Sequence, residues 1–283
     1  MQASAHQQRI VTAGLAVSLV ALALWQGGVL VTLALLALCG LGQWEFTAMF
    51  RPGPEHKNLR ITGVALGALL VLAAQAGGST AALWTFAACF WCLALRFLMR
   101  FSREHGPEHG PEHTPEGSGT RAALFTDELI LLCSLAYLPL MLQFLLTLST
   151  REIILVVLST TASDTAAYYA GTLWGRKKIW PQVSPKKSWA GSIGGLTGCI
   201  LAVTAYGLGL GNAPLPAWLL LGALLNLAAQ LGDFFESALK RSLNVKDSGT
   251  LLPGHGGLLD RIDSLLFALP CYALLRLIQP FFQ

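Results

Sequence analysis

Acidic residues interrupt several apolar segments of this chain, and in its C-terminal part they occur in pairs. Asp233 and Glu236 are three residues apart, as are Asp260 and Asp263, so each pair would share one face of a helix. Asp164 lies inside an earlier apolar segment. Because a carboxylate in apolar surroundings is costly, each such residue is a candidate for function. The complete set is Glu45, Asp127, Glu128, Asp164, Asp233, Glu236, Asp260 and Asp263.

Lysines and arginines accompany these acids. Residues 176–187 and 240–246 together hold eight of them. Carboxylates bind divalent metal ions and cations bind phosphates, so the combination predicts a site for a metal ion and phosphate groups. Two simpler interpretations each account for one acidic pair. The second pair could merely stabilise the N-terminus of a helix, and Glu236 could pair with Lys240 one turn away.

The elements that must position these groups are predicted to be membrane helices. Charged residues make up 12% of the 283 residues, half of the roughly 25% of soluble proteins, and the mean hydropathy is +0.57. A soluble chain of this composition could not cover its surface with polar groups, so we predict an all-α, polytopic integral membrane protein. The composition excludes a disordered chain, a disulfide-stapled secreted fold and a nucleic-acid-binding protein. The six cysteines lie in apolar runs, where they are expected to pack as small hydrophobic residues.

Nine segments are apolar and long enough to be candidate membrane spans. The first is interpreted as a retained helix, because it is long for a signal peptide and lacks a clear cleavage site. Glycine pairs at Gly27–Gly28 and Gly77–Gly78 predict tight turns between spans. The predicted spans are residues 9–26, 28–48, 61–77, 80–99, 122–148, 152–175, 190–210, 214–238 and 258–279.

The distribution of lysine and arginine predicts the orientation. With the N-terminus in the cytoplasm, 17 of the 19 Lys and Arg fall in cytoplasmic segments, and Arg151 and Arg276 fall outside. Cytoplasmic loops of membrane proteins hold such an excess. We therefore expect a multi-pass protein of the inner cell membrane, with the acidic pairs near its cytoplasmic face.

A low-complexity segment, residues 104–117, repeats the sequence GPEH. Its histidines, His105, His109 and His113, recur at every fourth position, which could indicate a weak metal site. The prolines between them prevent the helix that would align them, so we predict a disordered cytoplasmic loop.

The C-terminal signature of the chain resembles that of a known enzyme family. Residues 237–264 closely resemble the signature of the phosphatidate cytidylyltransferases, also called CDP-diacylglycerol synthases. The residues that carry the likeness are Ser237, Lys240, Arg241, Lys246, Asp247, Ser248, Gly249, Leu252, Pro253, Gly254, His255, Gly256, Gly257, Asp260, Arg261, Asp263 and Ser264.

Residues 164–176, 184–189 and 230–237 are similar to further blocks of that family. Two positions depart from the pattern, because Ala190 stands where the family usually has Glu and Ala166 stands where Gly is common. The N-terminal half is similar in hydropathy and in its Trp44-Glu45 pair. We therefore divide the chain into residues 1–121, with N-terminal helices and a cytoplasmic loop, and residues 122–283, the catalytic membrane region.

The resemblance implies transfer of a cytidylyl group from CTP to phosphatidate, with Mg²⁺ as cofactor. Asp233 and Asp260 would bind the metal, with Asp263 as a further ligand or a partner of one. Asp164 would complete the site or position a lysine, and His255 would contact a phosphate or protonate the leaving pyrophosphate. The expected substrate-binding residues are Ser184, Lys186, Lys187, Ser188, Lys240, Arg241, Lys246, Asp247, Gly256, Gly257 and Arg261.

Other interpretations stay open at this stage. Within enzymes, the alternatives are a CTP-dependent polyprenol kinase and a cytidylyltransferase for another lipid phosphate. An ion-coupled transporter would also carry acids inside its spans. Ser188 could cap the following helix and not bind substrate. The expected partners are CTP, phosphatidate and membrane lipid without nucleic acid; a second cation and a homodimer are left open.

Overall fold

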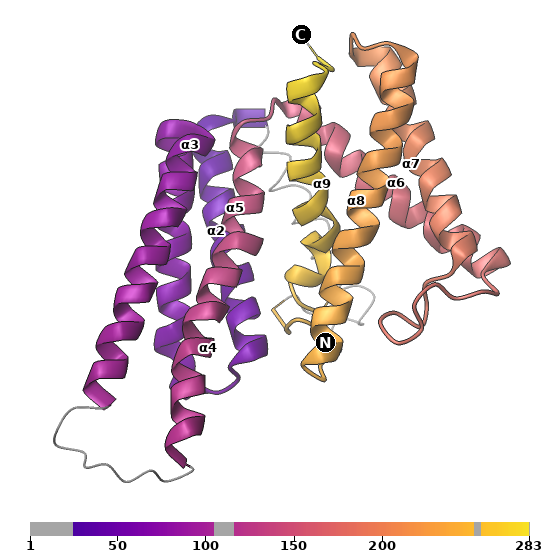
Figure 1. Ribbon diagram of the computed structural model, residues 1–283. Coiled ribbons are helices and arrows are strands. Elements are labelled where there is room, and N and C mark those ends of the chain that lie inside the picture. The colour runs from indigo at the N-terminus through magenta and orange to yellow at the C-terminus, as the bar shows by residue number, and fades with distance from the viewer. Residues whose placement is uncertain (1–24, 105–115, 252–255, 283) are drawn as a thin grey trace, which may run out of the picture. The chain divides into compact units, whose positions relative to one another are not determined.

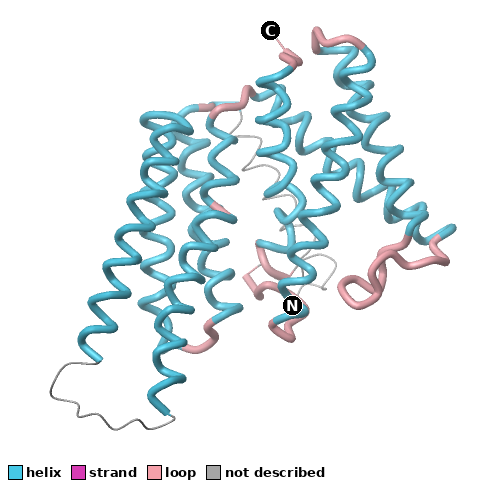
Figure 2. Tube along the Cα trace, viewed as in Figure 1, coloured by secondary structure: helices cyan, strands magenta, loops and turns pink. Residues whose placement is uncertain are grey.

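The computed structural model of the chain describes residues 25–104, 116–251 and 256–282. Within these ranges the chain is mostly helical and has no strand beyond an isolated bridge between Lys178 and Ser188 (Figure 1, Figure 2). The predicted all-α class is therefore confirmed. The first predicted span and the GPEH segment lie almost entirely outside the described residues.

Eight α-helices and two short 3₁₀ helices are described. The α-helices are α2 (Gly28–Phe50), α3 (Lys57–Glu104), α4 (Glu116–Tyr137), α5 (Pro139–Leu142), α6 (Thr150–Trp174), α7 (Trp189–Leu210), α8 (Leu215–Ser242) and α9 (Leu259–Ile278), and the 3₁₀ helices are η1 (Pro54–His56) and η2 (Gln143–Leu146).

Six helical stretches among the described residues are long and apolar enough to cross a membrane. This supports a polytopic membrane protein, but the predicted count of nine spans is not confirmed. One reason for the difference between nine and six spans is the charge content of helix α9. Helix α9 was predicted as a span and is not among the six, and its sequence holds four charged residues, two of them the candidate acids Asp260 and Asp263.

Helix α3 contains the predicted Gly77–Gly78 turn. Gly77 has φ −137° and ψ 19°, and Gly78 has φ +67° and ψ −165°, neither of which is helical. A positive φ is a conformation that glycine adopts readily, since it has no Cβ. The turn divides α3 into two limbs, seen in Figure 1, which correspond to the predicted spans 61–77 and 80–99.

The predicted span 122–148 is not continuous. Helix α4 ends at Tyr137, and Pro139 begins the short helix α5. Proline has no backbone N–H to donate to the preceding turn, and it is well tolerated at the first position of a new helix. The interruption therefore coincides with a residue that cannot continue the ladder of hydrogen bonds.

The chain packs into two compact units, one of which is Thr32–Gln143. In this unit Leu59, Cys89 and Leu93 from α3 pack with Leu131 and Leu135 from α4 in a buried core. Cys89 thus packs as a small hydrophobic residue, as predicted, and all six cysteines are free. The division predicted at residue 121 followed family likeness and not packing, so it stays a prediction.

The other unit includes Phe144–Gln283 and holds α6 to α9. Its most extensive helix–helix contact is between α6 and α7, where small residues let the backbones approach. A Cβ added to Gly194 would lie 2.3 Å from the Cβ of Ala170, and one added to Gly198 would lie 2.4 Å from the Cβ of Ala166. This packing fixes the face of α6 that carries Asp164.

A polar contact joins the start of α6 to the end of α9. Glu152 forms a capping box with Ser149 at the first turn of α6. Its carboxylate also accepts hydrogen bonds from the Tyr272 hydroxyl at 3.0 Å and from Arg276 Nη1 at 3.1 and 3.2 Å. The contact fixes the axial register between the helices that carry Asp164 and Asp263.

Candidate active site

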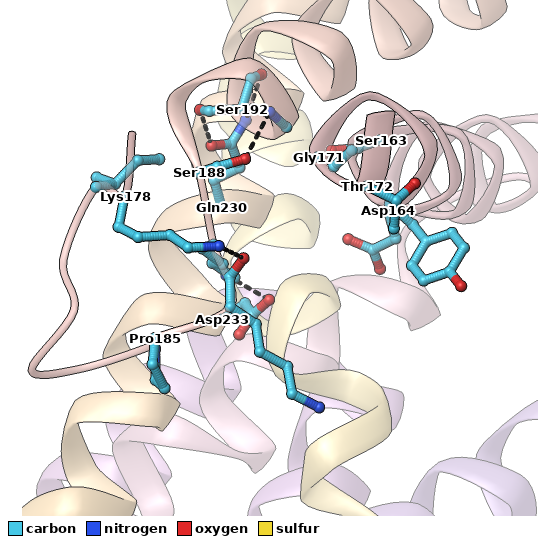
Figure 3. Close-up of a pocket in the computed structure, with 16 residues that line it drawn as sticks. Ser163, Asp164, Gly171, Thr172, Lys178, Pro185, Ser188, Ser192, Gln230 and Asp233 are labelled. Carbon is cyan, nitrogen blue, oxygen red and sulfur yellow. Dashed lines mark hydrogen bonds and ion pairs between the residues drawn. The ribbon is translucent and has the colours of Figure 1, made fainter. Parts of the chain in front are cut away.

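Two cavities in the Phe144–Gln283 unit meet at the predicted acidic residues. One, of about 560 Å³, lies among α6, the start of α7, α8 and the loop before α7, and we call it the α6–α7 cavity (Figure 3). The other, of about 390 Å³, is lined mostly by charged side chains, and we call it the charged cavity. Asp164, Lys186 and Asp233 line both, so the two cavities share one set of charged groups.

The structure brings most of the predicted site residues to the charged cavity. Five aspartates and five cationic side chains line it, together with Ser184 and Pro185. Lys187 and Ser188 line the α6–α7 cavity, and His255 lies outside the described residues. The charged residues of the charged cavity are Asp164, Asp233, Asp247, Asp260, Asp263, Lys186, Lys240, Arg241, Lys246 and Arg261.

Three of these carboxylates come from three different helices. Asp164 belongs to α6, Asp233 to α8 and Asp263 to α9, and Asp233 repels the other two electrostatically. Asp164 makes no hydrogen bond with another described residue. Asp263 Oδ1 accepts from the backbone N–H of Ser264 at 2.7 Å. Like charges brought together in this way favour a cation between them.

Lys187 forms an ion pair with one of these three carboxylates. Its ammonium forms an ion pair with Asp233 and lies 4.2 Å from the centre of the Phe234 ring. Asp233 Oδ1 also accepts from the Ser237 hydroxyl at 3.3 Å. Lys187 therefore holds the loop before α7 against α8 and places a positive charge where the cavities meet.

Asp260 has a different environment from the other acids. Its Oδ1 pairs with Lys240, and its Oδ2 accepts from the backbone N–H and hydroxyl of Ser248 at 3.0 and 3.1 Å and from the Gly257 N–H at 3.0 Å. Gly256 has φ +84°, a conformation that favours glycine, and so brings that N–H to the carboxylate. Asp260 thus organises the α8–α9 connection as well as lining the cavity.

Lys240 is held by two acids. Its Nζ lies 3.2 Å from Glu236 Oε1 at the i,i+4 spacing, and it pairs with Asp260. The simpler interpretation of Glu236 as a helix partner of Lys240 is therefore confirmed. Both side chains are buried, so Lys240 is less open to a phosphate than the predicted substrate-binding role requires.

The residues present fit a hard divalent cation in their chemistry. Carboxylate oxygens are the ligands that Mg²⁺ takes from proteins, and several aspartates line one cavity. Among the described residues no three His, Cys, Asp or Glu side chains converge closely enough to hold an ion as they stand. Among the described residues Asp164 accepts no hydrogen bond and Asp263 accepts one at Oδ1, which leaves its Oδ2 open to a metal ion, whereas both oxygens of Asp260 accept from donors.

A polar network beneath the acids was not predicted. Asn226 Oδ1 accepts from the Ser163 hydroxyl at 2.8 Å and from Gln230 Nε2 at 3.0 Å. Gln230 also binds Ser192 of α7 (Figure 3). The network joins α6, α7 and α8 directly beside Asp164 and Asp233. Its sequence signal is the spacing of Asn226, Gln230 and Asp233, which places all three on one face of α8.

Ser188 caps α7, as its alternative interpretation predicts. Its hydroxyl oxygen accepts from the backbone N–H of Gly191 at 3.2 Å, and its side chain is buried. The hydroxyl also lines the α6–α7 cavity. The cap therefore fixes the start of α7, where Gly191 and Ser192 contribute to the same cavity wall.

Comparison with known proteins yields a family and several relatives. Residues 7–278 match the cytidylyltransferase family. The chain is 42% identical over 153 residues to a phosphatidate cytidylyltransferase of Staphylococcus aureus strain COL, a match that covers 52% of this chain and 58% of that protein. It is 45% identical over 119 residues to a phosphatidate cytidylyltransferase of Bacillus subtilis strain 168, covering 41% of this chain and 44% of that protein. The matches thus span about half the length of these curated relatives.

Proposed function

Because the chain belongs to the cytidylyltransferase family, we propose that it catalyses the reaction of CTP with phosphatidate to give CDP-diacylglycerol and pyrophosphate. The names of the relatives and the C-terminal signature support this substrate pair. The 17-to-2 distribution of Lys and Arg supports placement of the site at the cytoplasmic face of the inner cell membrane, where CTP is available.

The observation that carries the proposal is the meeting of two unlike cavities at shared charged groups. The charged cavity offers cations and carboxylates suited to a triphosphate with its metal ion. The α6–α7 cavity includes apolar side chains, among them Ala167, Tyr168 and Ile179, beside the cation Lys187, which suits a lipid with a phosphate head. Since Asp164, Lys186 and Asp233 line both, the two substrates would meet there.

The chemistry needs few proton transfers from the protein. An oxygen of the phosphatidate phosphate attacks the α-phosphorus of CTP, the bond from that phosphorus to the bridging oxygen breaks, and pyrophosphate departs. A phosphate monoester has a second pKa near 6, so at neutral pH most of it is already a dianionic nucleophile. The residues must mainly hold two crowded anions in line and offset their charge.

The roles of the residues follow from their positions. Asp233, Asp260 and Asp263 would hold Mg²⁺, with Asp164 beside them, and the bound ion would offset charge on the triphosphate. Lys186 and Lys187 would bind phosphate where the cavities meet. Arg241, Lys246 and Arg261 would bind triphosphate or departing pyrophosphate in the charged cavity. His255 is proposed from the resemblance to assist the departing pyrophosphate.

Dual-labelled CTP tests the proposal. The purified full chain in lipid vesicles is incubated with CTP carrying one label in cytidine and another in the γ-phosphate, with either phosphatidate or a polyprenol as acceptor. We expect lipid-soluble cytidine label with phosphatidate. Lipid-soluble γ-phosphate without cytidine would indicate a kinase, and the absence of both labels from lipid would reject transfer to these acceptors.

A further inference from the structure

The proposed function leaves unexplained a cluster of charges in the Thr32–Gln143 unit. Arg51 follows α2, Arg96 and Arg100 lie near the end of α3, and Asp127 and Glu128 lie in α4. We call these five residues the arginine cluster. Their helix ends belong to the side that the Lys/Arg distribution predicts to be cytoplasmic.

Two of the arginines each form an ion pair with one of the two acids. Arg51 Nε lies 2.7 Å from Asp127 Oδ1. Arg96 binds both oxygens of Glu128, through Nε at 2.9 and 3.0 Å and through Nη2 at 2.6 Å. These are charge-assisted hydrogen bonds of good length, and the second is bidentate. Each acid therefore has its own arginine.

Arg100 is the surplus cation of the cluster. Its Nη1 lies 3.6 Å from Asp127 Oδ2 and 3.6 Å from Glu128 Oε1, beyond normal hydrogen-bond length. Its side chain is 40% exposed, more than those of Arg51 and Arg96. The cluster thus carries three positive and two negative charges, and Arg100 makes no hydrogen bond with another described residue.

Arg100 lies on the wall of a cavity of about 330 Å³. Arg96, Asn58 and Thr62 also line it, so most of its wall is polar. Two acids line it as well: Asp127 pairs with Arg51, and Glu55 is exposed, with its carboxylate 3.6 Å from His56 Nε2, a contact that forms an ion pair only when the imidazole is protonated. A cavity with a surplus guanidinium and neighbouring polar groups suits a compact anion.

Phosphate is the anion that this geometry and location favour. A guanidinium presents paired donors that match phosphate oxygens. Anionic phospholipids gather at the cytoplasmic membrane surface and attract cations there by about 1 kcal/mol for each Lys or Arg. We propose that the arginine cluster binds the phosphate group of an anionic membrane lipid through Arg100. This site lies within the Thr32–Gln143 unit and does not depend on the proposed catalytic function.

Native mass spectrometry of the full chain in neutral detergent tests the proposal. Short-chain phosphatidylglycerol serves as the probe, because it carries an anionic phosphodiester and is not a phosphatidate. We expect Arg100→Gln to weaken retention of one lipid molecule by about five- to tenfold, the effect of losing one cation of that strength. Equal retention by wild type and Arg100→Gln would overturn the proposal.

Lys57→Gln is the matched control. Lys57 starts α3 near the same cavity, is exposed and does not line it, so its loss removes one charge without removing a cavity group. If Lys57→Gln retains phosphatidylglycerol as wild type does, the result supports specific binding at Arg100. An equal loss of lipid retention in both variants would show that only general surface charge matters and would contradict the proposed site.

Further binding measurements identify the chemical class of the ligand. Zwitterionic phosphatidylcholine should be retained less than phosphatidylglycerol, and equal retention would contradict recognition of an anion. If inorganic phosphate displaces phosphatidylglycerol, the phosphate group alone is sufficient for binding at Arg100. If inorganic phosphate does not displace it, the result supports a membrane lipid as the source of the phosphate group. Arg100→Lys, which keeps the charge, should recover part of the binding. If Arg100→Gln does not fold, Arg100→Lys takes its place in the test. Retention of phosphatidylglycerol by folded Arg100→Lys that equals wild type would then overturn a site that depends on the guanidinium.

Discussion

At the scale of single residues, the acids of the site differ in what already binds them. Among the described residues Asp164 accepts no hydrogen bond and Asp263 accepts only at Oδ1, from the Ser264 N–H, whereas both oxygens of Asp260 accept, from Lys240, Ser248 and Gly257. If Asp260 also binds the metal ion, as proposed, its substitution would affect both the α8–α9 connection and the metal site. Asn keeps one acceptor oxygen, which can retain the contacts with Ser248 and Gly257, and loses the charge and the acceptor that pairs with Lys240, so a control variant must test the loop contacts alone.

Asp260→Asn should lower turnover by several powers of ten while the protein still inserts in the membrane. Loss of a direct ligand and its charge costs several kcal/mol of transition-state stabilisation. Steady-state rates of the purified variant at rising Mg²⁺ give the test, and partial rescue is expected if metal binding is damaged. Ser248→Ala is the matched control, since it removes one donor to Asp260 and leaves the carboxylate. Turnover of Asp260→Asn close to wild type would remove the residue from the metal site.

Lys187→Gln should reduce turnover by about ten- to a hundredfold, because it removes the cation beside Asp233 where the two substrates would meet. Lys178→Gln serves for comparison, as Lys178 lines the same cavity but donates to the backbone carbonyl of Lys186. Rates and apparent KM for both substrates are measured in vesicles. A larger effect at Lys178 than at Lys187 would contradict this assignment.

At the scale of elements, close packing of α6 on α7 positions Asp164. Gly194→Ala would place a Cβ 2.3 Å from that of Ala170, so the helices must separate. We expect a loss of about 1–3 kcal/mol in unfolding free energy, with lower turnover. Gly209→Ala, on the same helix, meets nothing within 4 Å and should be neutral or slightly stabilising. Thermal unfolding in detergent compares the two, and equal stability would argue against close packing as the determinant.

Sequence patterns predict the local features of these elements better than they predict the contacts between elements. Two adjacent glycines predict the break in α3, and a serine before an apolar run predicts the cap of α7. The pairing of Lys240 with Asp260 joins residues 20 positions apart, and that of Arg51 with Asp127 joins residues 76 apart. Such pairs depend on how helices pack, which hydropathy and spacing do not determine.

At the scale of the whole molecule, the charge distribution predicts which loops face the cytoplasm. Single cysteines at Gln182 and Asn212, both exposed, test this in a variant without native cysteines. Cysteine at position 182 should react with an impermeant thiol reagent only after lysis, whereas cysteine at position 212 should react in intact cells. The reverse pattern would place the site away from CTP. A cysteine at Ser248, in the other predicted cytoplasmic loop, would not be a suitable probe, because Ser248 is buried against Asp260.

Balanced product formation tests the central claim most directly. The purified full chain in vesicles is supplied with CTP, phosphatidate and Mg²⁺, and lipid-linked cytidine and pyrophosphate are measured together. We predict one pyrophosphate for each CDP-diacylglycerol in wild type and in Lys57→Gln, and neither product above background in Asp233→Asn. Pyrophosphate without lipid-linked cytidine, or undiminished formation of both products by folded Asp233→Asn, would contradict cytidylyl transfer at this site.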